Sequence, residues 1–277
     1  MEATDPHRHH QTKMVYRRLW DERVPINASS AFYDLAGFRA GAEPLDGFQL
    51  DEVGDVTDLD LAHLQCHIGL DTLSWARRGA RVSGLDFSET AVRTATDLAA
   101  ETGLAHRARF VTADVYDAVD VLGAHAFDLV YTGTGALMWL PDIDRWARAV
   151  AGLLRPDGRL YLSEFHPLTD VLDDESGTTV TRDYFAREPQ SYESPGSYAD
   201  REARTAHNIA TEWHHTFGDI LSAITAAGLR LEFVHEHHMI PFRRFDTLVE
   251  EDTRFRYPTG SARLPLMYSP AATAPAR

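Results

Sequence analysis

The sequence predicts an α/β fold in which a doubly wound, mostly parallel sheet has helices on both faces and ends in an antiparallel hairpin. From residue 59 onward, short apolar strand-like runs alternate with helical runs, which is typical of parallel sheets joined by crossover helices. Near the end of the chain, two strand-like runs follow each other without a convincing amphipathic helix between them. This break in the rhythm favours an antiparallel pair at the sheet edge.

The helices and strands of the sheet domain are predicted in order from the apolar runs and from the capping and helix-ending residues between them. Gly79 stops the first helix of the sheet domain, Ser88 is placed to cap the second, and Gly103 lies past its end. A further helix is expected at 142–154, just before the fifth strand. The predicted parallel strands lie at 61–66, 80–86, 107–114, 126–132 and 158–165, and the closing pair lies at 229–239 and 264–272.

A helical extension or cap is expected over residues 1–58, in front of the sheet. Apolar residues recur at helical spacing after residue 13, with Pro25 and Gly37 as breakers. The first 13 residues are polar and are expected to be loose. Their "HRHH" is interpreted as a disordered polar end rather than a metal site.

The sheet domain is predicted to span residues 59–271, and it contains a long insertion at 168–206. This insertion is rich in Asp, Glu, Ser, Gly and Pro, and connections of that length are usually lids or binding loops. A solvated insertion without a role is the alternative. Residues 272–277 are expected to form a disordered tail. With 277 residues, 44% of them apolar, the chain fits one large domain with additions.

Charge and composition limit the partners. A formal net charge of -15 without any Lys/Arg-rich run opposes binding to nucleic acid or to an anionic membrane. The single cysteine, Cys66, excludes an intrachain disulfide and indicates a reducing cytoplasm. No apolar run approaches the roughly 18 residues of a membrane span, and the N-terminus lacks the apolar core of a signal peptide. We therefore expect a soluble protein whose oligomeric state cannot be predicted.

The turn after the first strand is where an open α/β sheet binds a nucleotide, because backbone N–H groups and a helix N-terminus approach the ligand there. Gly69 lacks a Cβ, as such an approach requires. Gln65, Cys66, His67 and Ile68 stand where glycines are more usual. The turn alone does not identify a nucleotide site.

Two acidic residues at strand ends strengthen the case for a nucleoside. Asp86 ends the second strand 17 positions beyond Gly69, close to where a carboxylate accepts hydrogen bonds from ribose hydroxyls. Asp114 ends the third strand, where it could accept from an exocyclic amine such as that of adenine. Either residue alone could be a helix cap.

These segments together resemble the class I S-adenosylmethionine-dependent methyltransferases, over roughly residues 59–271. The resemblance rests on "HLQCHIGLDTLSWARRGARVSGLDFS", "FVTADVY", "FDLVYTGTGALMWLPD", "LLRPDGRLYLSEFHP" and the closing hairpin. It is strongest to a bacterial branch with "LQCH.G" in its first loop, a stretch like "EWHHTFGDI" and an ending like "RLPLMYS". It implies a Rossmann-like, seven-stranded sheet, with S-adenosylmethionine as cofactor and S-adenosylhomocysteine as product.

The resemblance also implies roles for individual residues. The backbone around Gln65, His67 and Gly69 would face the methionine part of the cofactor, and Asp86 would hold the ribose, with Phe87 against the adenine. The remaining cofactor contacts would come from Asp114 and Val115 at the adenine edge and from Thr132 and Gly133 at the sulfonium.

The chain departs from the family at three positions. His63 replaces a frequent acidic residue, and Gln65 and His67 replace two customary glycines. A dinucleotide is disfavoured, because its pyrophosphate would want the full glycine-rich turn. A sulfonium cofactor carries no phosphate, so a turn without these glycines can still bind it.

Two residues after the fifth strand are candidates for catalysis. Glu164 and His166 lie on the same side of an extended chain, at the edge where ligands bind. An imidazole is suited to act as a general base near neutral pH. The alternative is that His166 merely bonds the backbone before Pro167, and that Glu164 is structural.

Histidines are dense in the last part of the chain. His207 and His214 are candidates for substrate contacts, with packing of the helix near "TFGDILSAITAAG" as the alternative for the "EWHH" segment. His235 and His237 share a face of a strand and raise the possibility of a metal site with His214 or His215. No carboxylate or thiolate is fixed beside them, so no metal is predicted.

Aromatic residues could wall an apolar substrate pocket, although such residues are usually core. The resemblance favours Trp20 and Tyr33 as part of the active-site cover. Other candidates are Phe32 in the extension and Tyr131, Met138 and Trp139 after the fourth strand. The "YTGTGA" there lacks the Asn/Asp-Pro-Pro-aromatic motif of enzymes that methylate base or amide nitrogens.

The principal hypothesis is therefore a methyltransferase that acts on a small molecule. A role in specialised metabolism is expected from the usual functions of the family that the chain resembles. The acceptor atom cannot be predicted, because fold does not fix function. The alternatives are a non-methylating S-adenosylmethionine binder, such as a cyclase or a regulatory protein, and an NAD(P)-dependent oxidoreductase.

Overall fold

The computed structural model describes residues 6–276, with side chains from residue 15 onward. It divides into two compact units. Unit 1 comprises the chain up to residue 123 together with 190–211, and unit 2 comprises 124–189 together with the chain from 212 onward. The predicted insertion at 168–206 is thus shared, because residues after 189 belong to unit 1.

Unit 1 contains a three-stranded parallel part of the sheet in the order β3-β2-β1. The registers pair Leu64 with Leu85 and Asp86 with Thr112, so the carboxyl ends of the three strands lie at one edge. The elements of this unit are α1 (Pro6–Ser29), α2 (Leu35–Arg39), α3 (Gly47–Val53), β1 (Asp60–Leu64), α4 (Leu70–Arg77), β2 (Arg81–Asp86), α5 (Glu89–Glu101), β3 (Ala108–Thr112), η1 (Val115–Asp117), α6 (Ala118–Leu122), β7 (Gln190–Glu193) and most of β8 (Ile209–Glu212).

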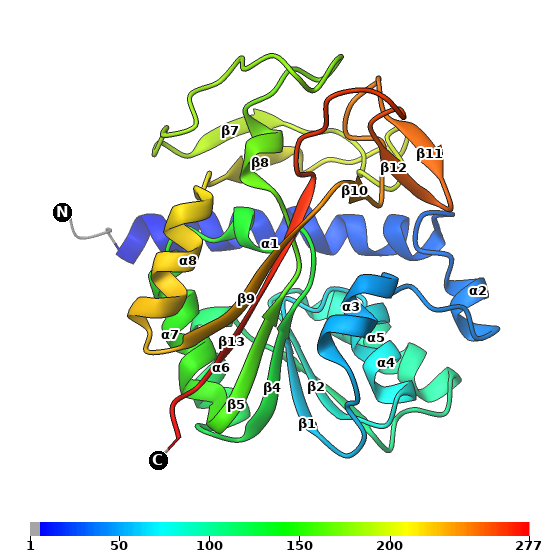
Figure 1. The fold of residues 1–277 in the computed structure, drawn as a ribbon. Coiled ribbons are helices and arrows are strands. Elements are labelled where there is room, and N and C mark those ends of the chain that lie inside the picture. Colours follow the sequence, from blue (N-terminus) through cyan, green and yellow to red (C-terminus); the bar gives the residue numbers. More distant parts are fainter. Residues whose placement is uncertain (1–5, 277) are drawn as a thin grey trace. The chain divides into compact units, whose positions relative to one another are not determined.

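The extension is more regular than the sequence predicts. Helix α1 runs without a break from Pro6 to Ser29, with Pro25 inside it (Figure 1). The expected loose start and the Pro25 breaker are therefore wrong from residue 6 onward, because buried contacts on one side of α1, at Leu19 and Val24, outweigh the local cost of a proline. The side chains of the "HRHH" lie outside the described residues.

Gly37 does not break a helix either, since it lies inside α2. Its N–H donates to Asp34 Oδ1 at 2.9 Å, which caps this short helix. A Cβ on Gly37 would lie 2.0 Å from the Asp34 carboxylate. The glycine is thus required by the cap rather than by a chain reversal.

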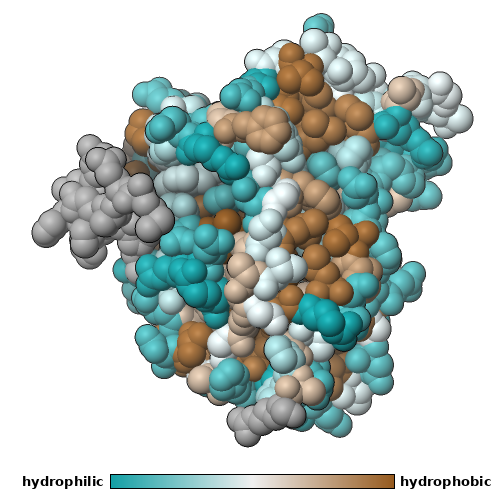
Figure 2. Space-filling model, turned by 60° about the vertical axis from the view of Figure 1, so that its left-hand side comes forward, coloured by the Kyte–Doolittle hydropathy of each residue, from teal (hydrophilic) through white to brown (hydrophobic). Residues whose placement is uncertain are grey.

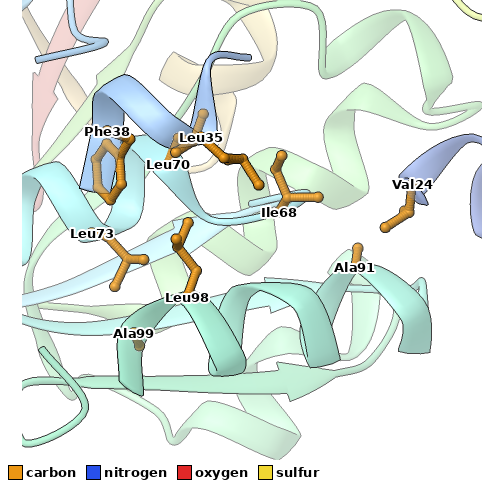
Figure 3. Close-up of a cluster of buried hydrophobic side chains, with 9 residues drawn as sticks. All are labelled: Val24, Leu35, Phe38, Ile68, Leu70, Leu73, Ala91, Leu98 and Ala99. Atoms are coloured by element: carbon orange, nitrogen blue, oxygen red, sulfur yellow. The ribbon is translucent and has the colours of Figure 1, made fainter. Parts of the chain in front are cut away.

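The extension also shares the apolar core of unit 1. Figure 3 shows Val24 from α1 and Leu35 and Phe38 from α2 beside side chains of α4, α5 and the turn between β1 and α4. The other members of this cluster are Ile68, Leu70, Leu73, Ala91, Leu98 and Ala99. Residues before 59 therefore stabilise the same hydrophobic core as the first strand-turn-helix.

Unit 2 contains β4 and β5 as parallel neighbours, followed by β13, which is antiparallel to both β5 and β9. The predicted closing hairpin is confirmed, with the last strand inserted between the fifth strand and its own partner. The elements of this unit are β4 (Phe127–Thr132), η2 (Leu137–Trp139), α7 (Ile143–Leu153), β5 (Leu154–Leu162), β6 (Glu164–Phe165), η3 (Pro167–Asp170), α8 (Phe217–Ala226), β9 (Arg230–His237), β10 (Met239–Ile240), β11 (Val249–Glu251), β12 (Arg254–Arg256) and β13 (Met267–Thr273).

The end of the chain is ordered further than expected. Ala272 and Thr273 belong to β13 and pair with Leu160 and Arg159 of β5, and Ala274 N–H donates to Gly158 O at 2.8 Å. The predicted tail from residue 272 is therefore wrong at its start, because the pairing of β13 with β5 continues through these residues.

The architecture confirms the predicted class, an α/β fold with a mostly parallel sheet and an antiparallel end strand. Figure 2 shows apolar patches on one face of the molecule, separated by hydrophilic residues. Among the helices that the structure describes, none has the length and apolar character needed to cross a membrane.

Candidate functional site

The turn between β1 and α4 adopts a glycine-like conformation without the glycines. Gln65 has φ 58° and His67 has φ 48°, and Gly69 follows with φ 79°. All three lie in the left-handed region, which side chains with a Cβ adopt at a cost. The turn therefore keeps the backbone path of a glycine-rich loop, although two of its positions carry large side chains.

His67 is held in this strained position by several contacts. Its Nδ1 accepts the Ile68 N–H at 2.6 Å, and its Nε2 lies 3.0 Å from the amide nitrogen of Asn27 in α1. The ring stacks on Tyr33 at 5.4 Å and meets Trp20 edge-on at 5.5 Å. Burial lowers the pKa of His67 to about 4, so the imidazole is neutral at physiological pH.

Asp86 connects the end of β2 to the turn. Its Oδ2 accepts the backbone N–H of His67 at 2.8 Å, and its Oδ1 accepts the N–H of Ser88 at 2.9 Å. Burial raises the pKa of Asp86 to about 6, opposed by these N–H donors and helped by the nearby carboxylate of Asp21. Asp21 itself accepts a short hydrogen bond from the Ser88 hydroxyl. The carboxylate retains acceptor capacity, because its two oxygens together offer about four lone pairs.

Gly69 also has a role in internal packing, beside its predicted role at the cofactor. A Cβ at this position would lie 2.8 Å from the Cβ of Ala95 and 2.9 Å from the ring of Phe110. These atoms belong to α5 and β3. The glycine therefore allows helix and sheet to approach closely beneath the turn, as one glycine of a nucleotide-binding turn commonly does.

The other predicted cofactor residues of unit 1 lie at the ends of β2 and β3. The carbonyl of Phe87 accepts from Arg17 Nε at 3.1 Å. Asp114 caps η1 by accepting the Tyr116 N–H at 3.0 Å, and Val115 is buried. Asp114 is thus a cap, the alternative that the sequence left open, and a cap carboxylate still has lone pairs for a second donor.

An aromatic cluster lies beside the turn and contains both predicted cover residues, Trp20 and Tyr33. Tyr198, from the insertion, lies 6.2 Å from each of these rings and 5.8 Å from Phe32. Its hydroxyl makes a short hydrogen bond with the Tyr33 hydroxyl. Burial, with the Asp86 charge nearby, raises the pKa of Tyr198 and that of Tyr33 well above the usual range of a phenol, so both hydroxyls stay protonated.

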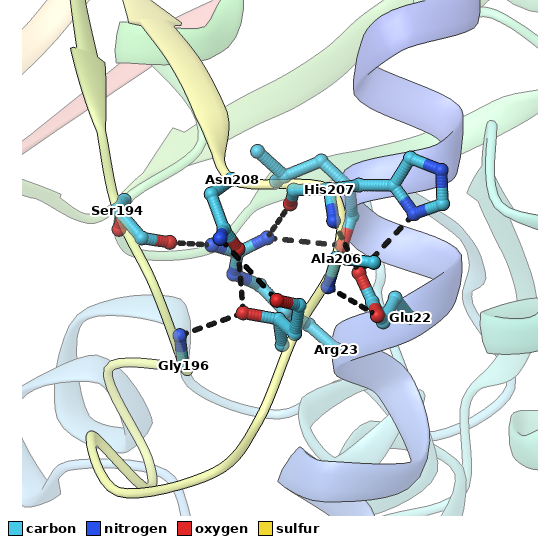
Figure 4. A network of polar contacts seen from close by, with 9 residues as sticks. Glu22, Arg23, Ser194, Gly196, Ala206, His207 and Asn208 are labelled. Carbon is cyan, nitrogen blue, oxygen red and sulfur yellow. Dashed lines mark hydrogen bonds and ion pairs between the residues drawn. The ribbon is translucent and has the colours of Figure 1, made fainter.

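Residues 194–208, which we call the strap, are fastened to α1 (Figure 4). The Glu22 carboxylate accepts the N–H groups of Ala206 at 2.7 Å and His207 at 2.8 Å. Buried Arg23 donates to the carbonyls of Ser194 and His207. His207, a predicted substrate contact, instead places Nδ1 3.2 Å from Glu22. The strap also reaches the turn, because Ser197 donates to Asn27, which contacts His67.

In unit 2, Glu164 fixes the loop that follows β4. Its carboxylate accepts the N–H groups of Gly135, Ala136, Leu137 and Phe165, at 2.5 to 3.0 Å. Burial raises the pKa of Glu164 to about 7, against the lowering effect of these four donors. The geometry supports the structural alternative for this residue, since both of its oxygens accept backbone N–H groups.

Thr132 and Gly133 at the end of β4 are buried. The Thr132 hydroxyl oxygen has no hydrogen-bond partner among the described residues. The loop beyond them contains Trp139, the last residue of η2. Tyr131 is fully buried and stacks on Tyr161 at 6.0 Å. The structure thus places the Tyr131 side chain in the core of unit 2, and its role as a substrate residue stays a prediction.

His166 has both ring nitrogens in contact with protein. Nδ1 accepts the Leu168 N–H at 3.2 Å, and Nε2 lies 3.0 Å from Glu236 Oε1. The ring stacks on Phe217 at 5.2 Å. Burial lowers the pKa of His166, while the Glu236 charge raises it. The backbone bond just before Pro167 agrees with the structural interpretation of this residue.

The downstream histidines have separate partners. His237 Nε2 lies 2.7 Å from Ser269 Oγ, and His235 stacks on Phe233 at 4.4 Å. Within the described part of the chain, no group of three or more His, Cys, Asp or Glu side chains could hold a metal ion. His214 differs from them, because its Nδ1 lies 3.6 Å from Asp170 Oδ2 and its buried Nε2 has no hydrogen-bond partner among the residues described.

Sequence reasoning missed Asn27, Ser197 and Tyr198. Their contacts join α1 to a segment about 170 positions later, and no local pattern signals such a pairing. The only hint was the length of the insertion.

Comparison with known proteins agrees with this geometry. Residues 61–158 match the family model described as a methyltransferase domain. Over 141 residues the chain is 34% identical to nocamycin O-methyltransferase of Saccharothrix syringae, covering 48% of this chain and 47% of that protein. The chain spans about half to three fifths of the length of the curated relatives it matches.

Solved structures share the fold at low sequence identity. A putative S-adenosylmethionine-dependent methyltransferase from Listeria monocytogenes matches with TM-score 0.60 and 18% identity, over 82% of this chain and 96% of that one. The [4+2]-cyclase SpnF matches with TM-score 0.55 and 17% identity, over 95% and 96%. These matches agree with the predicted family and its cofactor, S-adenosylmethionine: residues 61–158 match a methyltransferase domain, and the fold is shared with S-adenosylmethionine-dependent methyltransferases.

Proposed function

We propose that this protein transfers a methyl group from S-adenosylmethionine to a small-molecule acceptor in bacterial specialised metabolism, with a hydroxyl oxygen as the acceptor atom. Nocamycin O-methyltransferase and a ubiquinone biosynthesis O-methyltransferase, two curated relatives, support the choice of oxygen. The net charge of -15 argues against nucleic acid as the acceptor.

One observation carries the proposal. The Asp86 carboxylate ends β2 directly beside a turn whose backbone is left-handed at Gln65, His67 and Gly69. This is the arrangement expected for a nucleoside whose ribose hydroxyls are bound by a carboxylate and whose remainder lies along the turn.

The residues present fit such a cofactor. Asp86 has acceptor capacity left for a ribose hydroxyl after accepting backbone N–H groups, including those of His67 and Ser88. The neutral imidazole of His67, with its pKa near 4, adds no positive charge to repel a sulfonium. Considered by itself, unit 2 contains a buried Thr132 hydroxyl without a hydrogen-bond partner among the described residues, and buried polar atoms usually have such a partner.

The protein's part in the reaction is mainly positioning. When bound, S-adenosylmethionine supplies a methyl carbon that is attacked in line by the acceptor. Alignment of the reacting atoms can supply much of the acceleration. Asp86 would orient the nucleoside, and Glu164 would hold the loop beyond β4 rigid through its four backbone donors.

Calorimetric titration with S-adenosylhomocysteine, beside NAD and NADP under the same conditions, tests the cofactor. Selective binding of S-adenosylhomocysteine is expected, and binding of a dinucleotide in its place would contradict the proposal. A screen of phenols, enols and aliphatic alcohols with S-adenosylmethionine then tests the acceptor, with release of S-adenosylhomocysteine as the readout.

A non-methylating role is the second candidate, since a structure named as a [4+2]-cyclase shares the fold. Such a protein would bind S-adenosylhomocysteine and yet release none with any acceptor. A nicotinamide-dependent oxidoreductase is disfavoured by the missing glycines at positions 65 and 67. We propose the cytoplasm as the location, based on the single buried Cys66.

A further inference from the structure

Two buried polar atoms of unit 2 have no hydrogen-bond partner in the part of the chain that the structure describes: Nε2 of His214 and the hydroxyl of Tyr268. The His214 side chain is only 7% exposed, and Tyr268 is fully buried. Such atoms are costly to bury unpaired. Two of them in one region indicate that a polar group of a ligand completes their hydrogen bonding.

The two residues share neighbours. Asp170 Oδ2 lies 3.6 Å from His214 Nδ1, and the ring of Tyr184 lies 5.3 Å from that of His214. Burial, with the charge of Glu164 and the proximity of Tyr184 and Asp170, raises the pKa of Tyr268 well above its usual range. The Tyr268 hydroxyl therefore stays protonated and is a donor.

The carboxylate of Asp170, 3.6 Å from Nδ1, favours one tautomer of His214. A neutral imidazole carries one N–H, and a carboxylate near Nδ1 favours the proton on that nitrogen. The lone pair then lies on Nε2, the nitrogen without a partner. An acid that orients a histidine in this way recurs in bases that take a proton from a hydroxyl.

Both neighbours of His214 in the chain fix it against the loop beyond β4. Trp213 N–H donates to Met138 O at 2.9 Å, and His215 Nε2 lies 2.7 Å from Leu140 O. That loop begins at Thr132 and Gly133, which are predicted to line the sulfonium. His214 is thus held at the catalytic end of β4 within unit 2.

We propose that His214, oriented by Asp170, is the catalytic base that takes the proton from the acceptor hydroxyl, and that Tyr268 donates a hydrogen bond to the same oxygen. The acceptor class is a small molecule with a weakly acidic hydroxyl, a phenol or an enol. This inference rests on the proposed methyltransferase function. It assigns the base to His214 instead of His166, whose nitrogens both face protein groups.

The step balances without any further reactant. The O–H proton passes to His214 Nε2 while the oxygen forms a bond to the methyl carbon of S-adenosylmethionine. The carbon–sulfur bond breaks with its electron pair going to sulfur, which leaves S-adenosylhomocysteine. The imidazolium then returns its proton to solvent.

Histidine tautomers measured by nitrogen NMR on ¹⁵N-histidine protein test the dyad without any acceptor. His214 is expected to carry its proton on Nδ1 and a free lone pair on Nε2. His215 is a matched neighbour that is expected to show the opposite tautomer, because its Nε2 faces a carbonyl oxygen. The variants His214→Asn and His215→Asn assign the two signals. A proton on Nε2 of His214 would overturn the proposal.

Kinetics with a hydroxyl acceptor from the screen test the chemical role. His214→Asn should lower kcat by about 10²- to 10⁴-fold, leave the affinity for S-adenosylhomocysteine unchanged, and be partly rescued by added imidazole. Asp170→Asn should lower kcat less. His106→Asn, an exposed histidine of unit 1, should change nothing. Full activity of His214→Asn would refute the base while the methyltransferase function stands, whereas methylation only at nitrogen or carbon would refute both the acceptor class and the base.

Discussion

Asp86 should make cofactor binding depend on pH in the acidic range. Its pKa is raised to about 6 by burial, and only the ionised carboxylate has all its lone pairs available for the ribose hydroxyls. With a pKa near 6, about one tenth of the carboxylates are ionised at about pH 5 and nearly all at about pH 7.5. The Kd for S-adenosylhomocysteine should therefore rise about tenfold over this interval as the pH falls.

Isothermal titration calorimetry at several pH values between these limits checks the prediction, with Asp86→Asn as the control. The variant should bind about ten- to a hundred-fold more weakly at neutral pH, because it loses charge-assisted hydrogen bonds, and its Kd should not change with pH. A wild-type Kd that stays flat down to about pH 5 would refute the assignment of Asp86 to the ribose.

The raised pKa of Asp86 should also affect folding stability, which should fall with rising pH whereas cofactor binding strengthens. The pKa of Asp86 is higher in the folded protein than the ordinary value of 3.8, so the folded state binds more protons between the two values. Its stabilising contribution is present at acidic pH and is lost as the pH rises through about 6. The free energy of unfolding of the wild type, relative to Asp86→Asn, should fall over this range in urea titrations. A constant difference would contradict the raised pKa.

Three further substitutions test the architecture of the site. Gly69→Ala should lower the free energy of unfolding by at least about 2 kcal/mol, because backbone strain at positive φ and a steric clash with α5 add. Gly103→Ala is the control, since it has positive φ and open space around it, and it should cost about 1 kcal/mol. Equal losses of the two variants in urea unfolding would contradict the packing role of Gly69. Glu164→Gln should cost about 1 to 3 kcal/mol in the same assay, since one amide oxygen cannot accept from four N–H groups, and an unchanged midpoint would contradict the pinned loop. Arg23→Ala should expose the strap to limited proteolysis at a rate above wild type, with mass spectrometry locating the cuts, and cuts confined to other segments would contradict the fastening.

The sequence predicted the local signals well. Ser88 caps α5 by accepting the Ala91 N–H at 3.1 Å, as its position before the helix indicated. Gly79 and Gly103 follow α4 and α5 with positive φ. These features depend on a few adjacent residues, which is why a single sequence suffices to predict them.

Long-range contacts were less predictable. The sequence predicts a helix break at Pro25, because the energetic cost of a proline inside a helix is visible locally. The burial of α1 that outweighs this cost comes from core residues far along the chain. The left-handed backbone of Gln65 and His67 likewise depends on Asp86 and Asn27. The choice between His166 and His214 depends on which nitrogens meet Glu236, Leu168 or Asp170, and no spacing rule contains that information.

Helix α1 contacts both the turn and the strap. Asn27 contacts His67 of the turn, and Glu22 and Arg23 bind the strap. A nucleoside bound along the turn would therefore lie beside the helix to which the strap is fastened. We expect the residence time of S-adenosylhomocysteine to be long compared with the methyl-transfer step, so that product release limits turnover. Changes in the strap would then shorten this residence time and speed product release while leaving the bond-making chemistry untouched.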